Sequence, residues 1–330
     1  MLIERFPYSP RICFIVVKIY LLLSFSMFAA TALADAPRTI GTVESNDPRV
    51  DPAAKIEVIA EGMTWCEGPV WFKNRLLFSD IPRNTIFAWS PEEGVTPFMQ
   101  PSGYTGVEFY GLEPGSNGLA IDPDGRLCMC EHGDRRVSRL TPGGGKRTIV
   151  DNFQGKRLNS PNDLVFADDG TMYFTDPPYG LPKRENDPRR ELDFCGVYAF
   201  RDGKLTLLSD AIERPNGIGL SSDQTRLVVA QSNPSTPNWT VIDLDTGSAK
   251  QIADASEAMK QYPGLPDGLC VSNDDLIYAS GPGGIYVMDF QGNRLGRYIT
   301  GRRTSNCTLS PDGGTLYVTA DDVVCRIKVR

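Results

Sequence analysis

Short runs of alternating apolar and polar residues recur along the chain, and most of them lead into a turn signal. A representative run starts at Asn117 (NGLAIDPDGRLCMC), where an alternating segment is followed by Asp-Gly and a second apolar segment. Alternation with a period of two is typical of a half-buried strand, and a short Asp-Gly loop joins two strands into a hairpin. The pattern therefore predicts a succession of β-hairpins.

This hairpin pattern occurs six times, and a polar residue heads the first strand of each copy. The six lead residues are Glu67, Asn117, Asn162, Asn216, Asp267 and Asn306. Their spacings of 50, 45, 54, 51 and 39 residues leave room for four short strands per copy. Self-similarity at such a period is the signature of solenoids and propellers. We predict an all-β fold: a six-bladed β-propeller with four-stranded antiparallel blades around a central, metal-containing channel.

The segments between the copies fit the same fold. Strand-like stretches such as 137–140 and 285–290 supply the outer strands, and the one predicted helix is short, at 255–261. Two β-sandwiches or a β-solenoid are the alternative folds. Solenoid coils are shorter than these repeats, and no Pro-, Ser- or Gly-rich linker divides the chain. We therefore assign residues 61–330 to a catalytic propeller domain and residues 35–60 to an N-terminal lead-in segment.

The amino terminus has the pattern of an export signal. Three basic residues precede an apolar run at 19–33, which closes with the A-x-A pattern Ala32-Leu33-Ala34. The run is 15 residues long, short of the roughly 20 needed to span a bilayer, which disfavours the alternative of a permanent membrane anchor. We predict a signal peptide at 1–34, a mature chain that begins at Asp35 without a membrane span, and a periplasmic or secreted protein.

The composition of the chain argues against several classes of function. The chain carries 34 Lys and Arg against 41 Asp and Glu, a net charge of -7, which argues against nucleic-acid binding because phosphate backbones are bound by basic surfaces. His132 is the single histidine, so zinc sites with several histidines and H-E-x-x-H metalloproteases are excluded. Carboxylates and amides must therefore supply most of the chemistry.

The cysteines indicate less clearly whether they are free thiols or form disulfides. Removal of the signal peptide takes Cys13 away and leaves seven of the eight cysteines, an odd number, and most of the seven lie in apolar strand-like runs. Cysteine in such runs behaves as a small buried hydrophobe. Buried thiols are therefore favoured, with one or more disulfides as the alternative. Cys128 and Cys130 form C-x-C without a second pair, which does not suit a zinc site.

The six lead residues share one chemical property. In a propeller they should converge on the axis, and all six carry amide or carboxylate oxygens. One such residue alone could be a turn cap, since Asn and Asp readily bond their own backbone. A ring of hard oxygens suits a hard cation, and Ca²⁺ accepts about 6–8 oxygen ligands in flexible geometry. We predict one divalent cation on the axis, Ca²⁺ before Mg²⁺, Mn²⁺ or Zn²⁺.

Several motifs, taken together and in order, resemble the senescence-marker-protein (regucalcin)/gluconolactonase family of calcium-dependent lactonase propellers, particularly its bacterial gluconolactonase branch. The motifs are Glu67-Gly-Pro-Val-Trp, Ser160-Pro-Asn-Asp, Tyr173-Phe-Thr-Asp-Pro-Pro-Tyr-Gly, Pro215-Asn-Gly and Pro266-Asp-Gly-Leu. The likeness covers about residues 61–329.

The resemblance implies a single axial metal held by Glu67, Asn216 and Asp267, with Asn162 as a further ligand or a substrate contact. Animal members carry Arg two residues before this Asn, where Ser160 stands here, so their substrate preference does not carry over.

The activity implied by the resemblance is hydrolysis of a small-molecule lactone such as glucono-1,5-lactone. The metal would act as a Lewis acid on the ester carbonyl, with Asp267 as the catalytic general base or nucleophile. Two alternatives stay open. One is an arylesterase or phosphotriesterase of the paraoxonase-like type, and the other is a non-catalytic binding propeller with structural calcium.

Four further residues are candidate substrate contacts. Asn117 and Asn306 complete the axial ring, and His132 follows a second strand, where it could bind substrate hydroxyls or simply occupy a loop. Asp176 ends the matching strand of the next copy, with a turn cap before Pro177 as the alternative. No G-x-S-x-G motif supports a serine-hydrolase triad. The basic cluster Lys183, Arg184, Arg189 and Arg190 is expected to be a solvated loop.

Overall fold

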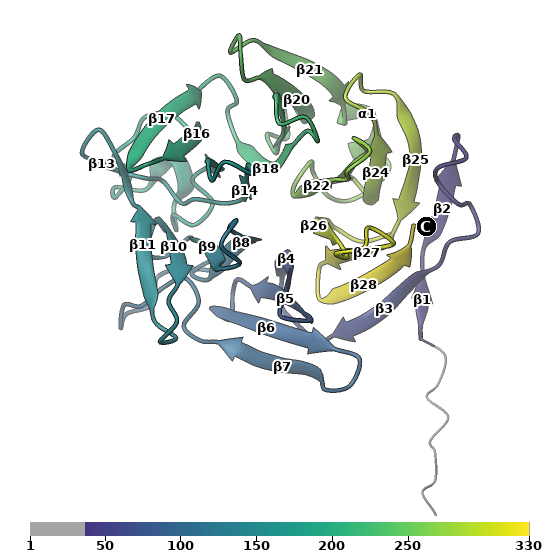
Figure 1. Ribbon diagram of the computed structural model, residues 1–330, viewed down its shortest axis with the longest axis horizontal. Helices are drawn as coiled ribbons and strands as arrows, with labels where there is room; N and C mark the ends of the chain where they lie inside the picture. Colours follow the sequence, from purple (N-terminus) through teal and green to yellow (C-terminus); the bar gives the residue numbers. More distant parts are fainter. Residues whose placement is uncertain (1–36, 330) are drawn as a thin grey trace, which may run out of the picture. The chain divides into compact units, whose positions relative to one another are not determined.

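Six antiparallel sheets form a ring around a central axis in the computed structural model, which describes residues 37–329 (Figure 1). The predicted six-bladed β-propeller is thereby confirmed. The expected signal peptide, with Cys13, lies outside the described residues. Between 37 and 329 no helix combines the length and the apolar character that crossing a membrane would require.

The first three blades follow one another along the chain. The first contains β4 (Cys66–Phe72), β5 (Arg75–Asp80), β6 (Thr85–Ser90) and β7 (Gly94–Met99). The second contains β8 (Ser116–Ile121), β9 (Leu127–Glu131), β10 (Arg136–Leu140) and β11 (Lys146–Val150). The third contains β14 (Leu164–Phe166), β15 (Met172–Asp176), β16 (Gly196–Arg201) and β17 (Lys204–Ser209). A small hairpin of β12 (Asn152–Phe153) and β13 (Lys156–Arg157) lies between the last two.

The remaining three blades complete the ring. The fourth contains β18 (Pro215–Leu220), β19 (Arg226–Gln231), β20 (Asn238–Asp243) and β21 (Ala249–Asp254). The fifth contains β22 (Leu269–Val271), β23 (Ile277–Gly281), β24 (Gly284–Met288) and β25 (Arg294–Ile299). The sixth begins with β26 (Thr304–Leu309), β27 (Thr315–Ala320) and β28 (Val323–Lys328). Of helical structure the described chain has α1 (Ser256–Met259), inside the predicted helical stretch, and the 3₁₀ turn η1 (Arg184–Asn186).

The amino-terminal segment closes the ring. Strand β3 (Ile56–Glu61) pairs antiparallel with β28 and is the fourth strand of the last blade, while β1 (Thr39–Ile40) pairs with β3. Strand β2 (Thr42–Ser45) pairs with β25 and extends the fifth blade. The segment treated above as a lead-in therefore supplies strands to two blades. The two ends of the propeller domain are joined by a strand ladder, which makes closure depend on pairing across the whole sequence.

Hydroxyl groups tie the innermost part of one blade to the next. Ser79 Oγ donates a hydrogen bond to the carbonyl oxygen of Asn117 over 2.9 Å, and Thr175 Oγ1 donates to that of Asn216 over 2.7 Å. Ser305 Oγ donates to the carbonyl oxygen of Cys66 over 2.6 Å, from the last blade to the first. These bonds give buried backbone carbonyls a side-chain donor, and they connect the inner strands around the axis.

Glycine follows four of the six lead residues because the inner strands approach one another closely. A Cβ on Gly217 would lie 2.3 Å from the carbonyl oxygen of Asp267. On Gly68, which has a φ of 48°, it would lie 2.2 Å from the carbonyl oxygen of Asn117. No side chain fits at either position. The glycine that follows a lead residue therefore allows neighbouring blades to approach this closely at the axis.

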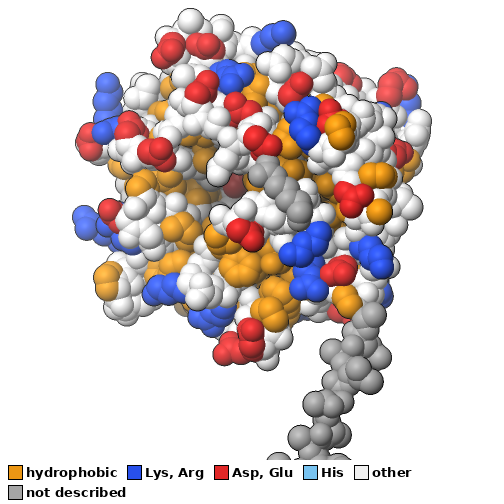
Figure 2. Space-filling model, turned by 45° about the vertical axis from the view of Figure 1, so that its right-hand side comes forward, with side chains coloured by type: hydrophobic (Ala, Val, Ile, Leu, Met, Phe, Trp, Pro, Cys, Tyr) orange, Lys and Arg blue, Asp and Glu red, His pale blue; other side chains and the backbone are white. Residues whose placement is uncertain are grey.

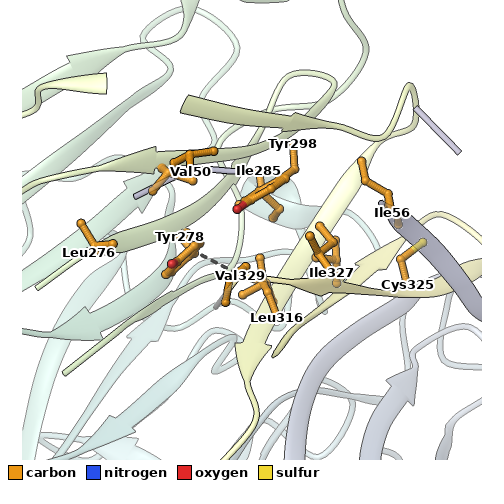
Figure 3. Close-up of a cluster of buried hydrophobic side chains, with 14 of the residues drawn as sticks. Val50, Ile56, Leu276, Tyr278, Ile285, Tyr298, Leu316, Cys325, Ile327 and Val329 are labelled. Carbon is orange, nitrogen blue, oxygen red and sulfur yellow. Dashed lines mark hydrogen bonds between the residues drawn. The ribbon is translucent and has the colours of Figure 1, made fainter. Parts of the chain in front are cut away.

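Apolar side chains fill the space between adjacent blades. The cluster shown in Figure 3 joins the last two blades, with Tyr278 and Ile285 from the fifth and Leu316 and Ile327 from the sixth. The seven cysteines of the described chain are free thiols, and six of them are buried. On the surface, acidic and basic side chains are interspersed over the face shown in Figure 2.

Candidate active site

A cavity of about 200 Å³ opens where the innermost strands begin. It brings together five of the eight predicted site residues: Glu67, Asn117, Asn162, Asn216 and Asp267. Each comes from a different blade, as the repeat predicts. The strands place one polar head residue apiece at the same height on the axis, so side chains separated by up to 200 sequence positions share one small cavity.

Glu67 is the buried carboxylate of the first blade, with 2% of its surface exposed. Its Oε2 accepts a hydrogen bond from the amide of Gly68 over 3.1 Å. Burial and the negative charge of Asp163 raise the pKa of Glu67 to about 8. A carboxylate held this way is destabilised as an anion unless a positive charge lies beside it.

Asp267 lies two residues before β22 and lines the same cavity. The residue is partly exposed, but its Oδ1 atom is buried and has no hydrogen-bond partner within the described structure. Burial, together with the charge of Glu67, raises the pKa of Asp267 well above its ordinary value. A buried, unpartnered carboxylate oxygen is costly, and in native sites it indicates a ligand or ion.

Asn216 and Asn117 both have partners for their amide nitrogens. Asn216 Nδ2 donates to Ser232 Oγ over 2.9 Å, and that hydroxyl donates to the carbonyl oxygen of Pro266 over 2.5 Å. Asn117 Nδ2 lies 3.4 Å from His132 Nε2, and Asn117 Oδ1 is buried without a partner in the described structure. With their donors engaged, both residues leave a carbonyl oxygen for the cavity.

His132 lies behind Asn117 and does not line the cavity. It is fully buried, and burial lowers its pKa to about 3, so the imidazole is neutral at physiological pH. Its Nδ1 atom lies 3.9 Å from Glu113 Oε2. A neutral ring can accept a hydrogen bond at Nε2, so His132 is placed to hold the orientation of Asn117.

The donor set fits a hard divalent cation. It consists of the buried carboxylate of Glu67 and the partly exposed carboxylate of Asp267, which repel each other, and of amide groups. Two buried oxygens, Asp267 Oδ1 and Asn117 Oδ1, lack partners in the described structure. Among residues 37–329 no three His, Cys, Asp or Glu side chains cluster as metal ligands. Any ion here would therefore depend on Asn oxygens as well as on Glu67 and Asp267, the composition that oxygen-preferring cations such as Ca²⁺ accept.

Two predicted substrate contacts lie elsewhere. Asp176 is fully buried, and its carboxylate accepts hydrogen bonds from the amides of Asn159 and Ser160, each over 2.8 Å. It fixes the loop before Asn162 and does not line the cavity. Asn306 also lies outside it: its Nδ2 is 3.4 Å from Asp163 Oδ2, and it borders a second cavity on the opposite side of the axial ring.

Sequence reasoning missed Asp163, which is 6% exposed and borders that second cavity. Burial raises its pKa to about 7. A signal was available, because four lead residues are followed by glycine, whereas Asn162 is followed by Asp163. The structure gives the reason: a Cβ on Gly118 would lie 2.5 Å from Asp163 Oδ1, so the aspartate occupies the space that the neighbouring glycine leaves open.

The rim of the cavity was also not predicted. Arg184 and Arg214 line it together with Glu113 and Tyr179, and Arg214 Nε donates to Glu185 Oε1 over 2.8 Å. The expectation of a purely solvated basic loop is thus corrected for Arg184. The turn η1, which contains Arg184, brings its side chain to the cavity.

The rest of the basic cluster stays away from the cavity. Arg189 pairs with Asp187 through Nε and Oδ1 over 2.9 Å, and Arg190 Nε donates to Asn159 Oδ1 over 3.2 Å. These contacts order the loop that carries η1.

A family profile and several lactonases resemble this chain over most of its length. The profile described as "SMP-30/Gluconolactonase/LRE-like region" matches residues 65–322. A gluconolactonase from Zymomonas mobilis is 39% identical over 310 residues, which cover 88% of this chain and 87% of the relative. A pentonolactonase from Haloferax volcanii is 29% identical over 77% of this chain and 80% of its own length. The structure of a gluconolactonase from Xanthomonas campestris superposes with a TM-score of 0.76 at 29% identity, covering 89% of this chain and 96% of that one.

Proposed function

The chain is a lactone hydrolase that belongs to the SMP-30/gluconolactonase/LRE-like family, and we propose that it opens sugar lactones such as glucono-1,5-lactone to aldonic acids. The observation that carries the substrate class is the cavity itself. The cavity is lined by the amide and carboxylate oxygens of the lead residues and, at its entrance, by arginines paired with glutamates. Its volume of about 200 Å³ suits a single sugar ring. The likeness to a gluconolactonase and a pentonolactonase supports the same class.

The rim supports a neutral, polyhydroxylated substrate. Arg214 is paired with Glu185, and Arg184 Nη2 lies 3.8 Å from Glu113 Oε1, so the guanidinium charges are balanced by carboxylates. An anionic substrate would be favoured by unpaired arginines. Paired arginine and glutamate side chains instead offer alternating fixed donors and acceptors, which match the hydroxyl groups of a sugar.

The proposed cofactor is one divalent cation, Ca²⁺ by preference, held by Glu67, Asn162, Asn216 and Asp267. When bound, it would polarise the lactone carbonyl and stabilise negative charge on its oxygen. Support comes from the buried, unpartnered Oδ1 of Asp267 and from the burial of Glu67, since a positive charge beside these two carboxylates would stabilise them as anions.

The protein's own groups would carry the proton transfers. The carboxylate of Asp267 accepts a proton from the attacking water as the water oxygen bonds to the carbonyl carbon. The ring C–O bond then breaks, and the departing alkoxide oxygen takes this proton back from Asp267, becomes the hydroxyl of the aldonic acid and regenerates the carboxylate. Arg184 and Arg214 orient the ring hydroxyls, which keeps the carbonyl next to Asp267.

A substrate panel with a matched pair of variants tests the proposal. Glucono-1,5-lactone and a pentonolactone are compared with δ-valerolactone, phenyl acetate and a phosphotriester by following proton release. We expect the sugar lactones to have the highest kcat/KM. Arg214→Leu should raise KM for them about tenfold, because a charge-assisted hydrogen bond is lost, while Arg201→Leu on a distant strand leaves KM unchanged.

Equal kcat/KM for δ-valerolactone and the sugar lactones would contradict the sugar-lactone assignment. A preference for phenyl acetate or the phosphotriester would favour the esterase alternative.

We also propose that the chain is exported and cleaved after Ala34. The basic residues, the apolar run at 19–33 and the A-x-A pattern support this. The first strand of the described residues begins at Thr39, so cleavage after Ala34 leaves the described strands intact. Amino-terminal sequencing of protein from the periplasm or medium of native cells should read from Asp35. An uncleaved chain in the cytoplasmic fraction would contradict export.

A further inference from the structure

Two cysteines from neighbouring blades meet beside the second axial cavity. Cys270 lies in β22 and Cys307 in β26, the innermost strands of the fifth and sixth blades, and their Sγ atoms are 3.7 Å apart. Both residues line a cavity of about 290 Å³ on the opposite side of the axial ring from the lactone site. The catalytic proposal uses neither thiol.

The two thiols differ in accessibility. Cys270 is partly exposed, whereas Cys307 is 3% exposed and donates a hydrogen bond from Sγ to the carbonyl oxygen of Tyr278 over 3.1 Å. The other five cysteines of the described chain are buried. A small reagent that enters the cavity therefore reaches Cys270, and Cys307 lies in position to react next.

We propose that Cys270 and Cys307 are an oxidation site at which a disulfide forms between the fifth and sixth blades. A disulfide has an S–S length of about 2.05 Å, so the sulfurs must approach by roughly 1.7 Å, a movement within reach of side-chain rotation. In this closing step Cys307 gives up its hydrogen bond to Tyr278. The bond would connect residues 37 positions apart in the sequence and clamp two blades at their innermost strands.

The chemistry is thiol–disulfide exchange with a small disulfide as the oxidant. The Cys270 thiolate attacks one sulfur of the oxidant, forms a mixed disulfide and releases the first small thiol. Cys307 then loses its proton, and its sulfur attacks Cys270 Sγ and releases the second small thiol. The two cysteines lose two electrons and two protons, and the oxidant is reduced to two thiols. An oxidising compartment favours this direction.

Peptide mapping of the full chain tests the proposal. The protein is incubated with cystamine, its remaining thiols are blocked with N-ethylmaleimide under denaturing conditions, and it is digested without reductant. We expect a cross-linked peptide pair that contains Cys270 and Cys307 and is two hydrogen atoms lighter than the separate peptides. Cys270→Ser and Cys307→Ser should each abolish the pair, and the matched control Cys195→Ser should retain it.

Stability and activity give a second readout. Closing this loop restricts the unfolded chain, so oxidation should raise Tm by about 4–8 °C, reversibly with dithiothreitol. Lactone turnover should be unchanged, because the pair lies away from the catalytic cavity. Recovery of Cys307 fully modified by N-ethylmaleimide, or of Cys270 only as a stable mixed disulfide with cystamine, would overturn the proposal.

Discussion

The two ends of the axial channel are built from the same inner strands but differ in character. At one end the strands begin with Glu67, Asn117, Asn162, Asn216 and Asp267, which surround a polar cavity. A few residues further along the same strands, the walls are formed by apolar side chains such as Val70, Leu119, Ile218 and Val271. The change takes place within two to four positions of a single strand.

This difference shows how a propeller separates chemistry from packing. The heads of the inner strands carry polar groups, whose burial is costly. The following residues pack between blades and supply the hydrophobic stabilisation that offsets this cost. Substitutions at the head should therefore change turnover, whereas substitutions further along should change stability. The predictions below test that division.

The largest effect should follow from Asp267→Asn. The amide keeps an oxygen at the site but removes the charge and the proton acceptor, so kcat for glucono-1,5-lactone should fall by about 10²- to 10⁴-fold. The free energy of unfolding should change little. Asp245→Asn, on an exposed turn, is the matched control and should keep wild-type kcat. Near-normal turnover by a folded Asp267→Asn protein would favour a non-catalytic axial site.

Leu119→Ala should lower the stability of the protein and leave kcat nearly unchanged, the reverse of Asp267→Asn. Leu119 is 5% exposed and packs with Leu77, Leu127 and Met129 between the first two blades. Its truncation leaves a cavity and should lower the free energy of unfolding by about 2–5 kcal/mol, measured by urea denaturation. Val95→Ala, at an exposed position, should be close to neutral. A large loss of kcat in Leu119→Ala, at a temperature where the protein is folded, would contradict the separation of turnover at the strand heads from stability further along the strands.

Gly217→Ala tests the close approach at the strand heads. Its new Cβ would lie 2.3 Å from the backbone oxygen of Asp267, which cannot move without shifting the next blade. We expect a loss of about 1–3 kcal/mol in unfolding free energy, with KM raised because Asp267 is displaced. Gly143→Ala meets nothing within 4 Å and is the control. Equal stability of the two variants would show that the inner strands tolerate a wider spacing.

Substitution of His132 should have a smaller effect, on how the free energy of unfolding depends on pH. Its folded pKa of about 3 lies below the unfolded value of about 6.5, so between these values the unfolded chain binds a proton that the folded chain does not. Stability from this group is therefore present above pH 6.5 and lost as the pH falls, by at most about 1.4 kcal/mol per pH unit. His132→Gln should show a flatter dependence of unfolding free energy between pH 7 and 5. Parallel curves for the two proteins would refute the assignment.

The sequence predicted the blades well because each carries its own local signal. The polar lead residue, the alternating strand and the turn recur six times, and this recurrence placed five site residues on the axis. Closure by β3 could not be predicted in the same way. A single strand that pairs with a partner more than 250 residues away leaves no local pattern.

The site residues other than the lead residues could not be predicted from the repeat, because their positions depend on how the loops fold. His132 follows β9, and Asp176 is the last residue of the equivalent strand β15. Asp176 binds backbone amides of the preceding loop, whereas His132 contacts the lead residue Asn117. Arg184 looked like part of a solvated charge cluster, but the conformation of its loop brings it to the cavity. Asp163 was marked in the sequence by its place in the repeat, where four other copies have glycine.

The central claim is that a divalent cation held at the strand heads is required for lactone hydrolysis, and metal removal tests it most directly. Protein stripped with a chelator is titrated with Ca²⁺, while bound metal per chain and turnover of glucono-1,5-lactone are measured on the same samples, for wild type and for Glu67→Gln. The account predicts that turnover is lost on stripping and returns in proportion to binding of one ion per chain, with weaker binding in Glu67→Gln. Full turnover by the metal-free wild-type protein would contradict it.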